Sequence, residues 1–206
     1  MKTLDFQKIN NIHFIGIGGV GMSALAQLFL EQGKGISGSD SGESKTIEML
    51  RERGVEISIG HSVNNVPSDA DLVIYSDAVK ANNVERVRAG ELSKQTLSYF
   101  EALGKVASEY YLIAVSGAHG KTTTTAMLAD VLEDTGLDPT VVVGSIRART
   151  KSNFRAGKSN YFVVEADEYM RHFLNFTPKV LIILNIDGDH LDYYKDIADI
   201  QSAFGE

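Results

Sequence analysis

Residues 117–123 have the types and the spacing of a loop that binds phosphate groups. The run Gly117-Ala-His-Gly-Lys-Thr-Thr123 ends in Gly-Lys-Thr, although Val115 stands where the longer pattern G-x-x-x-x-G-K-[ST] requires glycine. In such a loop, successive backbone N–H groups surround an anion. The ammonium group of Lys121 can reach the β- and γ-phosphates of a nucleotide, and the hydroxyl of Thr122 can coordinate Mg²⁺. Threonine is a poor helix former, so the run Thr122–Thr125 favours a role at phosphates over a purely structural one.

Two groups of carboxylates follow apolar runs further along the chain. Glu165-Ala-Asp-Glu168 comes after Tyr161–Val164, and Asn185-Ile-Asp-Gly-Asp-His190 comes after Val180–Leu184. Ligands of open α/β sheets bind at the carboxyl ends of the strands, where these groups would meet. Carboxylates suit Mg²⁺, whereas a histidine ligand is less usual for this ion. The alternative is that the acids cap helices and the histidine is a hydrogen-bonded structural group.

A second glycine-rich turn lies near the N-terminus. Gly16-Ile-Gly-Gly-Val-Gly21 matches G-x-G-x-x-G between an expected strand and an expected helix, and Asp40 follows 19 positions after Gly21. Glycines allow the backbone to approach a pyrophosphate, whose charge then lies at a helix N-terminus. The turn is consistent with a dinucleotide, whose ribose Asp40 would bind, with a nucleotide-sugar pyrophosphate, or with close helix packing alone.

The elements that must position these residues alternate along the chain. Each half begins with an apolar strand, a glycine turn and a helix, which is typical of parallel α/β domains. The short and almost wholly apolar runs of the second half suit central parallel strands. We place a domain boundary near Ser108, which gives domains 1–108 and 109–206. Strands are expected at 11–17, 35–39, 55–59, 71–76, 110–115, 139–143, 161–165 and 180–184, and helices at 20–32, 44–53, 92–107 and 122–134.

Composition excludes several classes of protein. The 206 residues include no Cys, which rules out thiol catalysis, Cys-based zinc sites and disulfides. A net charge of −7 does not favour nucleic-acid binding. No apolar run approaches the ~20 residues that span a bilayer, and the polar segment Met1–Asn10 has no apolar signal core. We therefore expect a cytoplasmic protein without membrane insertion, whose oligomeric state stays open.

Basic residues cluster in one segment of the second half. No acidic residue interrupts the set Arg147, Arg149, Lys151, Arg155 and Lys158. The simple interpretation is a solvated loop, and the functional one is a loop that meets an anionic substrate.

Taken together, these pieces resemble one family, the ATP-dependent Mur ligases of peptidoglycan synthesis. The similar segments follow the family's order through nearly the whole chain. They are Gly16–Ala26, Ser37–Asp40, Gly117–Thr125, Glu165–Glu168 and Asn185–His190. One departure is Ala118, which stands where the family usually has Thr. The resemblance implies a Rossmann-like N-terminal domain that binds a UDP-sugar, followed by a truncated, P-loop-type central domain with a mainly parallel sheet.

The resemblance also implies roles for individual residues. Lys121, Glu165 and His190 would be catalytic, with Thr122 binding one Mg²⁺ and Glu165 and His190 binding a second. The ATP phosphates would lie on Gly117, Ala118, His119, Gly120, Lys121, Thr122 and Thr123. The UDP pyrophosphate would lie on Gly16, Gly18, Gly19, Val20, Gly21, Met22 and Ser23, and Asp40, His61 and Ser76 would line the uridine pocket.

The implied reaction joins L-alanine to UDP-N-acetylmuramate through an acyl phosphate, with ATP and Mg²⁺. Full ligases of the family have a third domain that binds the amino acid, so we expect this chain to be an incomplete fragment that does not ligate. A tripeptide ligase on the same nucleotide sugar and a non-catalytic nucleotide-binding module remain alternatives. A nicotinamide oxidoreductase also fits the first glycine turn, but it has no use for the phosphate loop of the second half.

Overall fold

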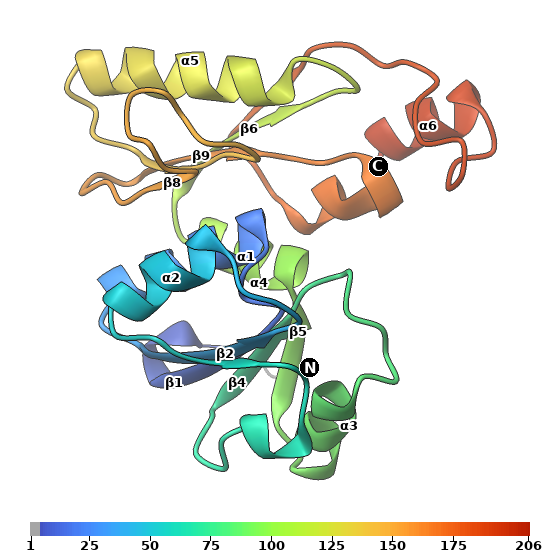
Figure 1. Cartoon of the computed structure of the whole chain (residues 1–206). Coiled ribbons are helices and arrows are strands. Elements are labelled where there is room, and N and C mark those ends of the chain that lie inside the picture. The colour runs from blue at the N-terminus through green and yellow to red at the C-terminus, as the bar shows by residue number, and fades with distance from the viewer. Residues whose placement is uncertain (1–4) are drawn as a thin grey trace. The chain divides into compact units, whose positions relative to one another are not determined.

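The computed structural model describes residues 5–206 and divides the chain into two units, Met1–Ala102 and Leu103–Glu206. Each unit is built around its own five-stranded sheet (Figure 1). The first four residues of the polar N-terminal segment lie outside the described part. None of the helices in residues 5–206 combines the length and the apolar character that a membrane span requires.

The first unit has a fully parallel sheet with the strand order β3-β2-β1-β4-β5. The helices α1 and α2 lie on one face of the sheet and α3 on the other (Figure 1). The strands are β1 (Asn11–Ile15), β2 (Gly35–Asp40), β3 (Glu56–Ile59), β4 (Leu72–Tyr75) and β5 (Gln95–Ser98). The helices are α1 (Val20–Glu31), α2 (Lys45–Glu52) and α3 (Val84–Glu91), with 3-10 turns η1 (Phe6–Lys8) and η2 (Val63–Asn65). Helix α4 (Tyr99–Ala107) begins in the first unit and ends in the second.

The apolar residues of the central strand β1 form part of the core of the first unit. Strand β1 has neighbours on both sides, and helices cover both faces of the sheet, so Ile12, Phe14 and Ile15 are all buried. The Phe14 ring packs against Phe29 of α1 with centroids 6.4 Å apart. This packing holds the end of β1, and therefore the glycine turn that follows it, in a fixed place.

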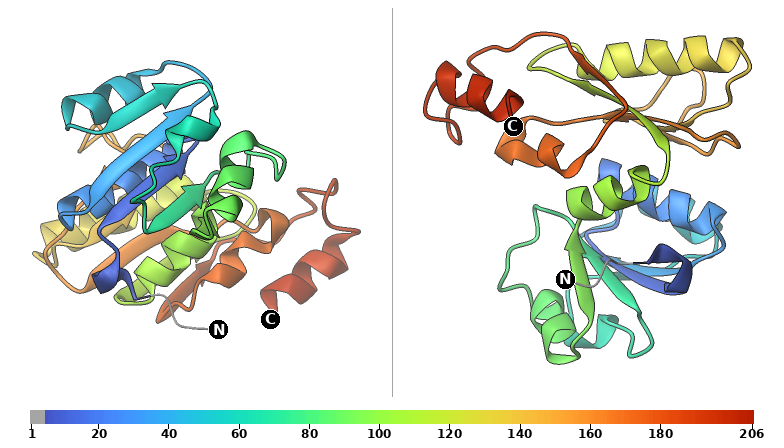
Figure 2. Two further views of the ribbon diagram at one scale, coloured as in Figure 1. Left: turned by 90° about the horizontal axis from the view of Figure 1, so that it is seen from below. Right: turned by 180° about the vertical axis from the view of Figure 1, so that it is seen from behind.

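The second unit has a mixed sheet with the order β10-β6-β9-β7-β8. All neighbours are parallel except the short antiparallel pair β7–β8. Helix α5 runs along one face of this sheet (Figure 2), where Ala129 packs on Val141 and Val163. The strands are β6 (Tyr111–Ser116), β7 (Thr140–Val142), β8 (Phe154–Arg155), β9 (Tyr161–Glu165) and β10 (Val180–Ile183). The helical segments are α5 (Lys121–Asp134), η3 (Tyr169–Asn175) and α6 (Ile197–Phe204).

The expected fold class is confirmed, but some elements differ from those expected. Helix α3 and the short strand β8 were not predicted, and the helix between the two halves begins later than expected. The helix expected at 92–107 is wrong over its first part, because Gln95–Ser98 forms the edge strand β5 beside β4. Ser93 has φ +52°, a left-handed conformation that a continuous helix does not contain. Leu97 is the buried residue of β5, and the helix α4 begins only at Tyr99.

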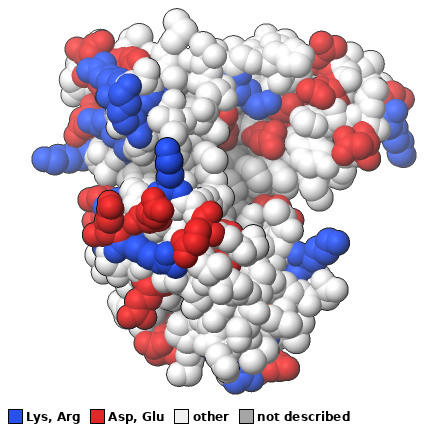
Figure 3. Space-filling model, viewed as in Figure 1, with Lys and Arg blue, Asp and Glu red and all other residues white. Residues whose placement is uncertain are grey.

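The basic cluster of residues 147–158 is tied to acids of its own unit. Arg147 is 4% exposed, and its guanidinium pairs with Asp130 and with Glu133 of α5, the latter at 2.7 Å. Arg149 and Arg155 also approach Glu133, at 3.4 and 3.5 Å. Figure 3 shows basic side chains interspersed with acidic ones on one face of the molecule. For the buried Arg147, these ion pairs replace the solvated-loop interpretation.

Candidate functional site

The first glycine turn connects β1 to α1 and is fixed by Asp40. Gly16 has φ +83°, a conformation that favours glycine, and Gly19 caps α1. The Oδ2 atom of Asp40 accepts a hydrogen bond of 2.8 Å from the Gly18 N–H, and its Oδ1 accepts one of 2.7 Å from the Ser41 N–H. A Cβ atom on Gly18 would lie 2.9 Å from Asp40 Oδ2. The carboxylate therefore holds the turn after β1 against the loop after β2.

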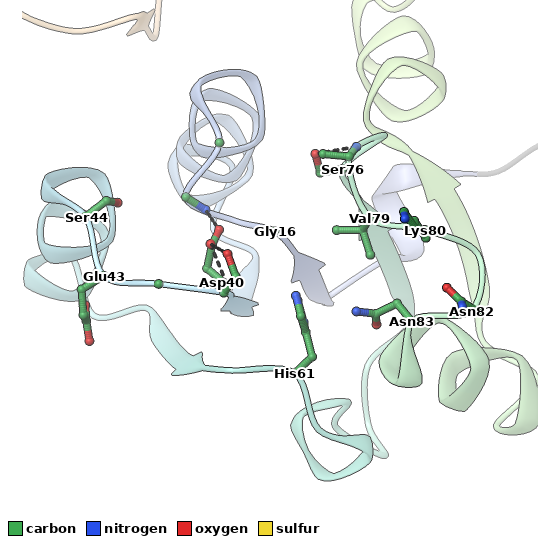
Figure 4. Close-up of a pocket in the computed structure, with 15 residues that line it drawn as sticks. Gly16, Asp40, Glu43, Ser44, His61, Ser76, Val79, Lys80, Asn82 and Asn83 are labelled. Atoms are coloured by element: carbon green, nitrogen blue, oxygen red, sulfur yellow. Dashed lines mark hydrogen bonds between the residues drawn. The ribbon is translucent and has the colours of Figure 1, made fainter.

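A pocket of about 730 Å³ opens beside this turn. It lies at the carboxyl ends of β1, β2 and β4, the place where ligands of parallel α/β sheets bind (Figure 4). His61 points into it between Asp40 on one side and Val79 on the other (Figure 4). The lining residues are Gly16, Gly18, Gly19, Asp40, Ser41, Gly42, Glu43, Ser44, His61, Ser76, Ala78, Val79, Lys80, Asn82 and Asn83.

The structure separates the expected nucleotide-sugar residues into two sets. Six of them line the pocket, namely Gly16, Gly18, Gly19, Asp40, His61 and Ser76. The other four do not line it. Met22 and Ser23 are buried in α1, and the Ser23 hydroxyl donates to the carbonyl of Val20, which is itself half exposed. A Cβ on Gly21 would lie 2.4 Å from the Tyr99 ring, so this glycine permits close packing of α1 on Tyr99.

Several lining residues were missed by sequence reasoning. Glu43 and Ser44 follow β2, and Lys80, Asn82 and Asn83 follow β4. Their position in the sequence could have identified them, because residues just after a parallel strand lie at the edge of the sheet where ligands bind. Glu43 and Lys80 add one charge of each sign to the pocket wall.

The second glycine turn connects β6 to α5 and is fixed by Asn185. Gly117 has φ +126°, and a Cβ there would lie 2.8 Å from the Asn185 carbonyl oxygen. The Ala118 N–H donates to that carbonyl at 3.2 Å, and the His119 N–H donates to the Asn185 side-chain oxygen at 2.9 Å. Gly120 caps α5 with φ +86°. The loop is therefore held beside the end of β10, with the N-terminus of a 14-residue helix behind it.

Lys121 lies at the centre of this second site. Its Nζ donates hydrogen bonds to the carbonyls of Gly117 at 2.7 Å and Ala118 at 3.3 Å, and to Glu168 Oε2 at 2.7 Å. Glu168 is 3% exposed. Its other oxygen, Oε1, is buried and accepts no hydrogen bond from the described residues, although His190 Nε2 lies 3.5 Å away. The lysine is thus held at the loop by a carboxylate rather than extended into solvent.

Glu165 lies next to the first turn of α5. Its Oε2 accepts a hydrogen bond from the Thr122 hydroxyl at 3.2 Å, and its Oε1 accepts one from the Gly144 N–H at 2.9 Å. Burial raises the pKa of Glu165, and these two hydrogen bonds together with the charge of Lys121 partly oppose that rise. A nearby cation would stabilise the charged form of this buried carboxylate.

The expected metal ligands Thr122, Glu165 and His190 are divided between two neighbouring clusters. Thr122 and Glu165 are hydrogen-bonded to each other, whereas His190 lies beside Glu168. Within the described residues, Asp167, Glu168 and His190 offer ligand atoms that all lie within 4.8 Å of one another. The carboxylate oxygens of this cluster, including the Glu168 Oε1 that has no hydrogen-bond donor among the described residues, fit a divalent cation such as Mg²⁺, whereas the imidazole nitrogen of His190 is a less usual ligand for this ion. Sequence spacing did not single out Glu168 as the partner of Lys121 and His190.

Comparison with known proteins covers both units. Residues 11–111 match the Mur ligase family, catalytic domain, and residues 115–206 match the Mur ligase middle domain. The chain belongs to the Mur ligase family. Other Mur ligases are similar to it over nearly its whole length. It is 48% identical over 203 residues to the UDP-N-acetylmuramate–L-alanine ligase of Alkaliphilus metalliredigens, and 49% identical over 197 residues to that of Sulfurihydrogenibium sp..

Solved Mur ligase structures are similar in fold as well. The UDP-N-acetylmuramate–alanine ligase of Thermotoga maritima matches with a TM-score of 0.85 at 39% identity, over 95% of this chain and 46% of that one. A ligase from Neisseria meningitides, named for UDP-N-acetylmuramate and L-alanyl-γ-D-glutamyl-meso-diaminopimelate, matches with a TM-score of 0.87 at 28% identity, over 95% of this chain and 66% of that one. The match to the Alkaliphilus relative spans 98% of this chain but only 44% of the relative's own length.

Proposed function

We propose that this chain carries the nucleotide-sugar and ATP sites of a ligase that joins L-alanine to UDP-N-acetylmuramate at the expense of ATP. The relatives named for that reaction are 45–49% identical to the chain, which supports this substrate pair. The observation that carries the proposal is the cluster of Lys121, Thr122 and Glu165 at the start of α5. A cytoplasmic location remains a prediction.

The UDP-sugar would lie in the pocket of the first unit. Its pyrophosphate would approach Gly18 and Gly19 at the N-terminus of α1, where backbone N–H groups and the helix dipole favour an anion. The volume of about 730 Å³ lies in the range of small-molecule sites. Asp40 and His61 would line the part of this pocket that holds the nucleoside.

ATP would lie on the loop of the second unit. Lys121 would exchange the carboxylate of Glu168 for the β- and γ-phosphates, and the N–H groups of the first turn of α5 would donate to phosphate oxygens. Thr122 and Glu165 would hold one Mg²⁺, and His190 with Glu168 would hold a second. Bound Mg²⁺ would supply neutralisation of the triphosphate charge. The contribution of the chain itself is to hold phosphates and the sugar-acid carboxylate in position.

A titration of the chain with ATP, followed by calorimetry with and without Mg²⁺, tests this assignment. Thr122→Val keeps the shape of the side chain and removes the hydroxyl, so we expect ATP affinity to lose most of its dependence on Mg²⁺. The matched control is Thr135→Val at the C-cap of α5, whose hydroxyl donates to the carbonyls of Val131 and Leu132 in that helix. If Thr122→Val binds ATP–Mg²⁺ as the unchanged chain does, the metal role of Thr122 is wrong.

A ligase that attaches a peptide to the same nucleotide sugar is the second candidate. It is favoured by the high TM-score of the Neisseria structure, whose name includes a tripeptide. The higher sequence identity to the L-alanine ligases favours the first candidate.

A further inference from the structure

Glu85 is a buried carboxylate that joins the pocket of the first unit to its core. It is the second residue of α3 and is 0% exposed. Its Oε2 accepts a hydrogen bond of 2.5 Å from the Ser39 hydroxyl. Its Oε1 accepts hydrogen bonds from Asn65 Nδ2 at 2.7 Å and from the Ser62 N–H at 3.1 Å, and it lies 3.3 Å from His61 Nδ1. One side chain thus connects β2, α3 and the loop that carries His61.

This carboxylate is ionised at neutral pH. Burial raises the pKa of Glu85, but the nearby His13 ring, whose Nε2 lies 3.7 Å from Oε2, and the hydrogen bonds from Ser39, Asn65 and the Ser62 N–H outweigh burial and bring the pKa to about 2. An ionised carboxylate can only accept hydrogen bonds. Every group within hydrogen-bond distance of its oxygens must therefore act as a donor.

The ionised Glu85 determines which nitrogen of the His61 ring carries the proton. Since Glu85 cannot donate, the proton of the neutral imidazole must lie on Nδ1, where it is donated to Oε1. The second ring nitrogen, Nε2, then carries a lone pair. The His61 side chain is 25% exposed and points into the pocket (Figure 4). A histidine whose one nitrogen is held by a carboxylate presents the other in a defined state.

We propose that Glu85 is a positioning residue that fixes His61 as the Nδ1–H tautomer, so that Nε2 accepts a hydrogen bond from a hydroxyl or ring N–H of the bound nucleoside. The tautomer follows from the contact with an ionised Glu85 and needs no bound nucleotide. The role toward the nucleoside rests on the proposed function, because it needs a uridine nucleotide in this pocket. A uridine nucleotide has such donors in its two ribose hydroxyls and in the one ring N–H of uracil, whereas the pyrophosphate offers only acceptors.

Nuclear magnetic resonance of protein labelled with ¹⁵N-histidine tests the tautomer directly. At pH 8 we expect His61 to show a protonated Nδ1 and an unprotonated Nε2. Glu85→Gln places a neutral amide there, which accepts more weakly and can also donate, so we expect a mixture of tautomers. Ser39→Ala is the matched control, because it removes a donor to Oε2 and leaves the contact of Oε1 with His61. If His61 of the unchanged chain carries its proton on Nε2, the proposal is wrong.

A double-mutant cycle with UDP as the probe tests the role in binding. We expect Glu85→Gln to weaken UDP binding about tenfold when His61 is present, and by less than about twofold in a His61→Ala background. Equal losses in both backgrounds would show that Glu85 acts through the fold and would overturn the positioning role. If the unchanged chain does not bind UDP, the proposed function and the nucleoside contact are overturned together, whereas the tautomer is decided by the magnetic resonance experiment in the absence of any ligand.

Discussion

The Nζ atom of Lys121 lies 2.7 Å from the Oε2 atom of Glu168, and the two side chains are only 15% and 3% exposed. The lysine that resembles the phosphate-binding lysine of the family is therefore half of a nearly buried ion pair. Such a pair ties the stability of the second unit to the residue that would hold the phosphates. Binding and stability must be separated before a loss of activity in a Lys121 variant can be interpreted.

Removal of Lys121 alone leaves Glu168 as an uncompensated buried charge. We expect Lys121→Met to destabilise the second unit by about 3 kcal/mol, the cost typical of breaking a buried pair. In the double variant Lys121→Met/Glu168→Gln no charge is left unpaired, so most of this loss returns in urea unfolding followed by circular dichroism. We expect the double variant to bind no ATP. Equal stability of Lys121→Met and the unchanged chain would contradict the pairing.

Gly117 is a second residue of the phosphate loop at which we expect a substitution to disrupt the structure. A Cβ at this residue meets the backbone oxygen of Asn185 at 2.8 Å and its nitrogen at 3.0 Å, and φ is +126°. We expect Gly117→Ala to cost about 2 kcal/mol of unfolding free energy and to abolish ATP binding, because the loop must leave Asn185. The control is Gly188→Ala, since a Cβ at Gly188 meets nothing within 4 Å. A thermal unfolding midpoint for Gly117→Ala equal to that of Gly188→Ala would refute this account of the loop.

Asp40 should matter for the shape of the first glycine turn. Its two oxygens each accept a backbone N–H, from Gly18 and from Ser41, and an amide cannot replace both acceptors. We expect Asp40→Asn to weaken UDP binding about tenfold, with a loss of about 1 kcal/mol in stability. Glu56→Gln, an exposed change at the edge strand β3, serves as the control and should alter neither. Fluorescence-based UDP titration and urea unfolding measure the two effects, and unchanged UDP affinity of Asp40→Asn would count against the turn as the pyrophosphate site.

Glu85 gives the first unit a defined dependence on pH. Its pKa is about 2 when folded, against 4.5 for an unperturbed Glu. The unfolded chain therefore binds more protons between these values, and stability is lost as pH falls from about 4.5 to about 2. The complete loss amounts to about 3 kcal/mol. We expect the stability difference between the unchanged chain and Glu85→Gln to shrink across this window in urea unfolding, and a difference that stays constant with pH would contradict the depressed pKa.

The sequence predicted the central strands well and the edges poorly. Runs such as Leu112–Val115 and Phe162–Val164 are continuously apolar because neighbours cover both sides, and this pattern is visible without a structure. Gln95–Ser98 contains one buried residue, Leu97, and pairs on one side only, so its pattern is too weak to separate it from a helix.

The sequence predicted the glycine turns of the two candidate sites well. It predicted less well which side chains contact those turns. The phosphate loop Gly117–Thr122 is one continuous segment, so its chemistry can be inferred from residues that are adjacent in the sequence. The pairing of Lys121 with Glu168 rather than Glu165 depends on how the chain turns after β9, which residue spacing does not determine. Glu85 was missed because its significance comes from Ser39, Ser62 and Asn65, which lie 20 or more positions away.

Separate titrations of the chain and of Lys121→Met/Glu168→Gln with UDP-N-acetylmuramate, NADH and ATP–Mg²⁺ test the central assignment most directly. We predict that the unchanged chain binds the nucleotide sugar and ATP but not NADH, and that the double variant loses only ATP. Binding of NADH in place of the nucleotide sugar, or loss of both ligands in a folded double variant, would contradict the assignment of one nucleotide site to each unit.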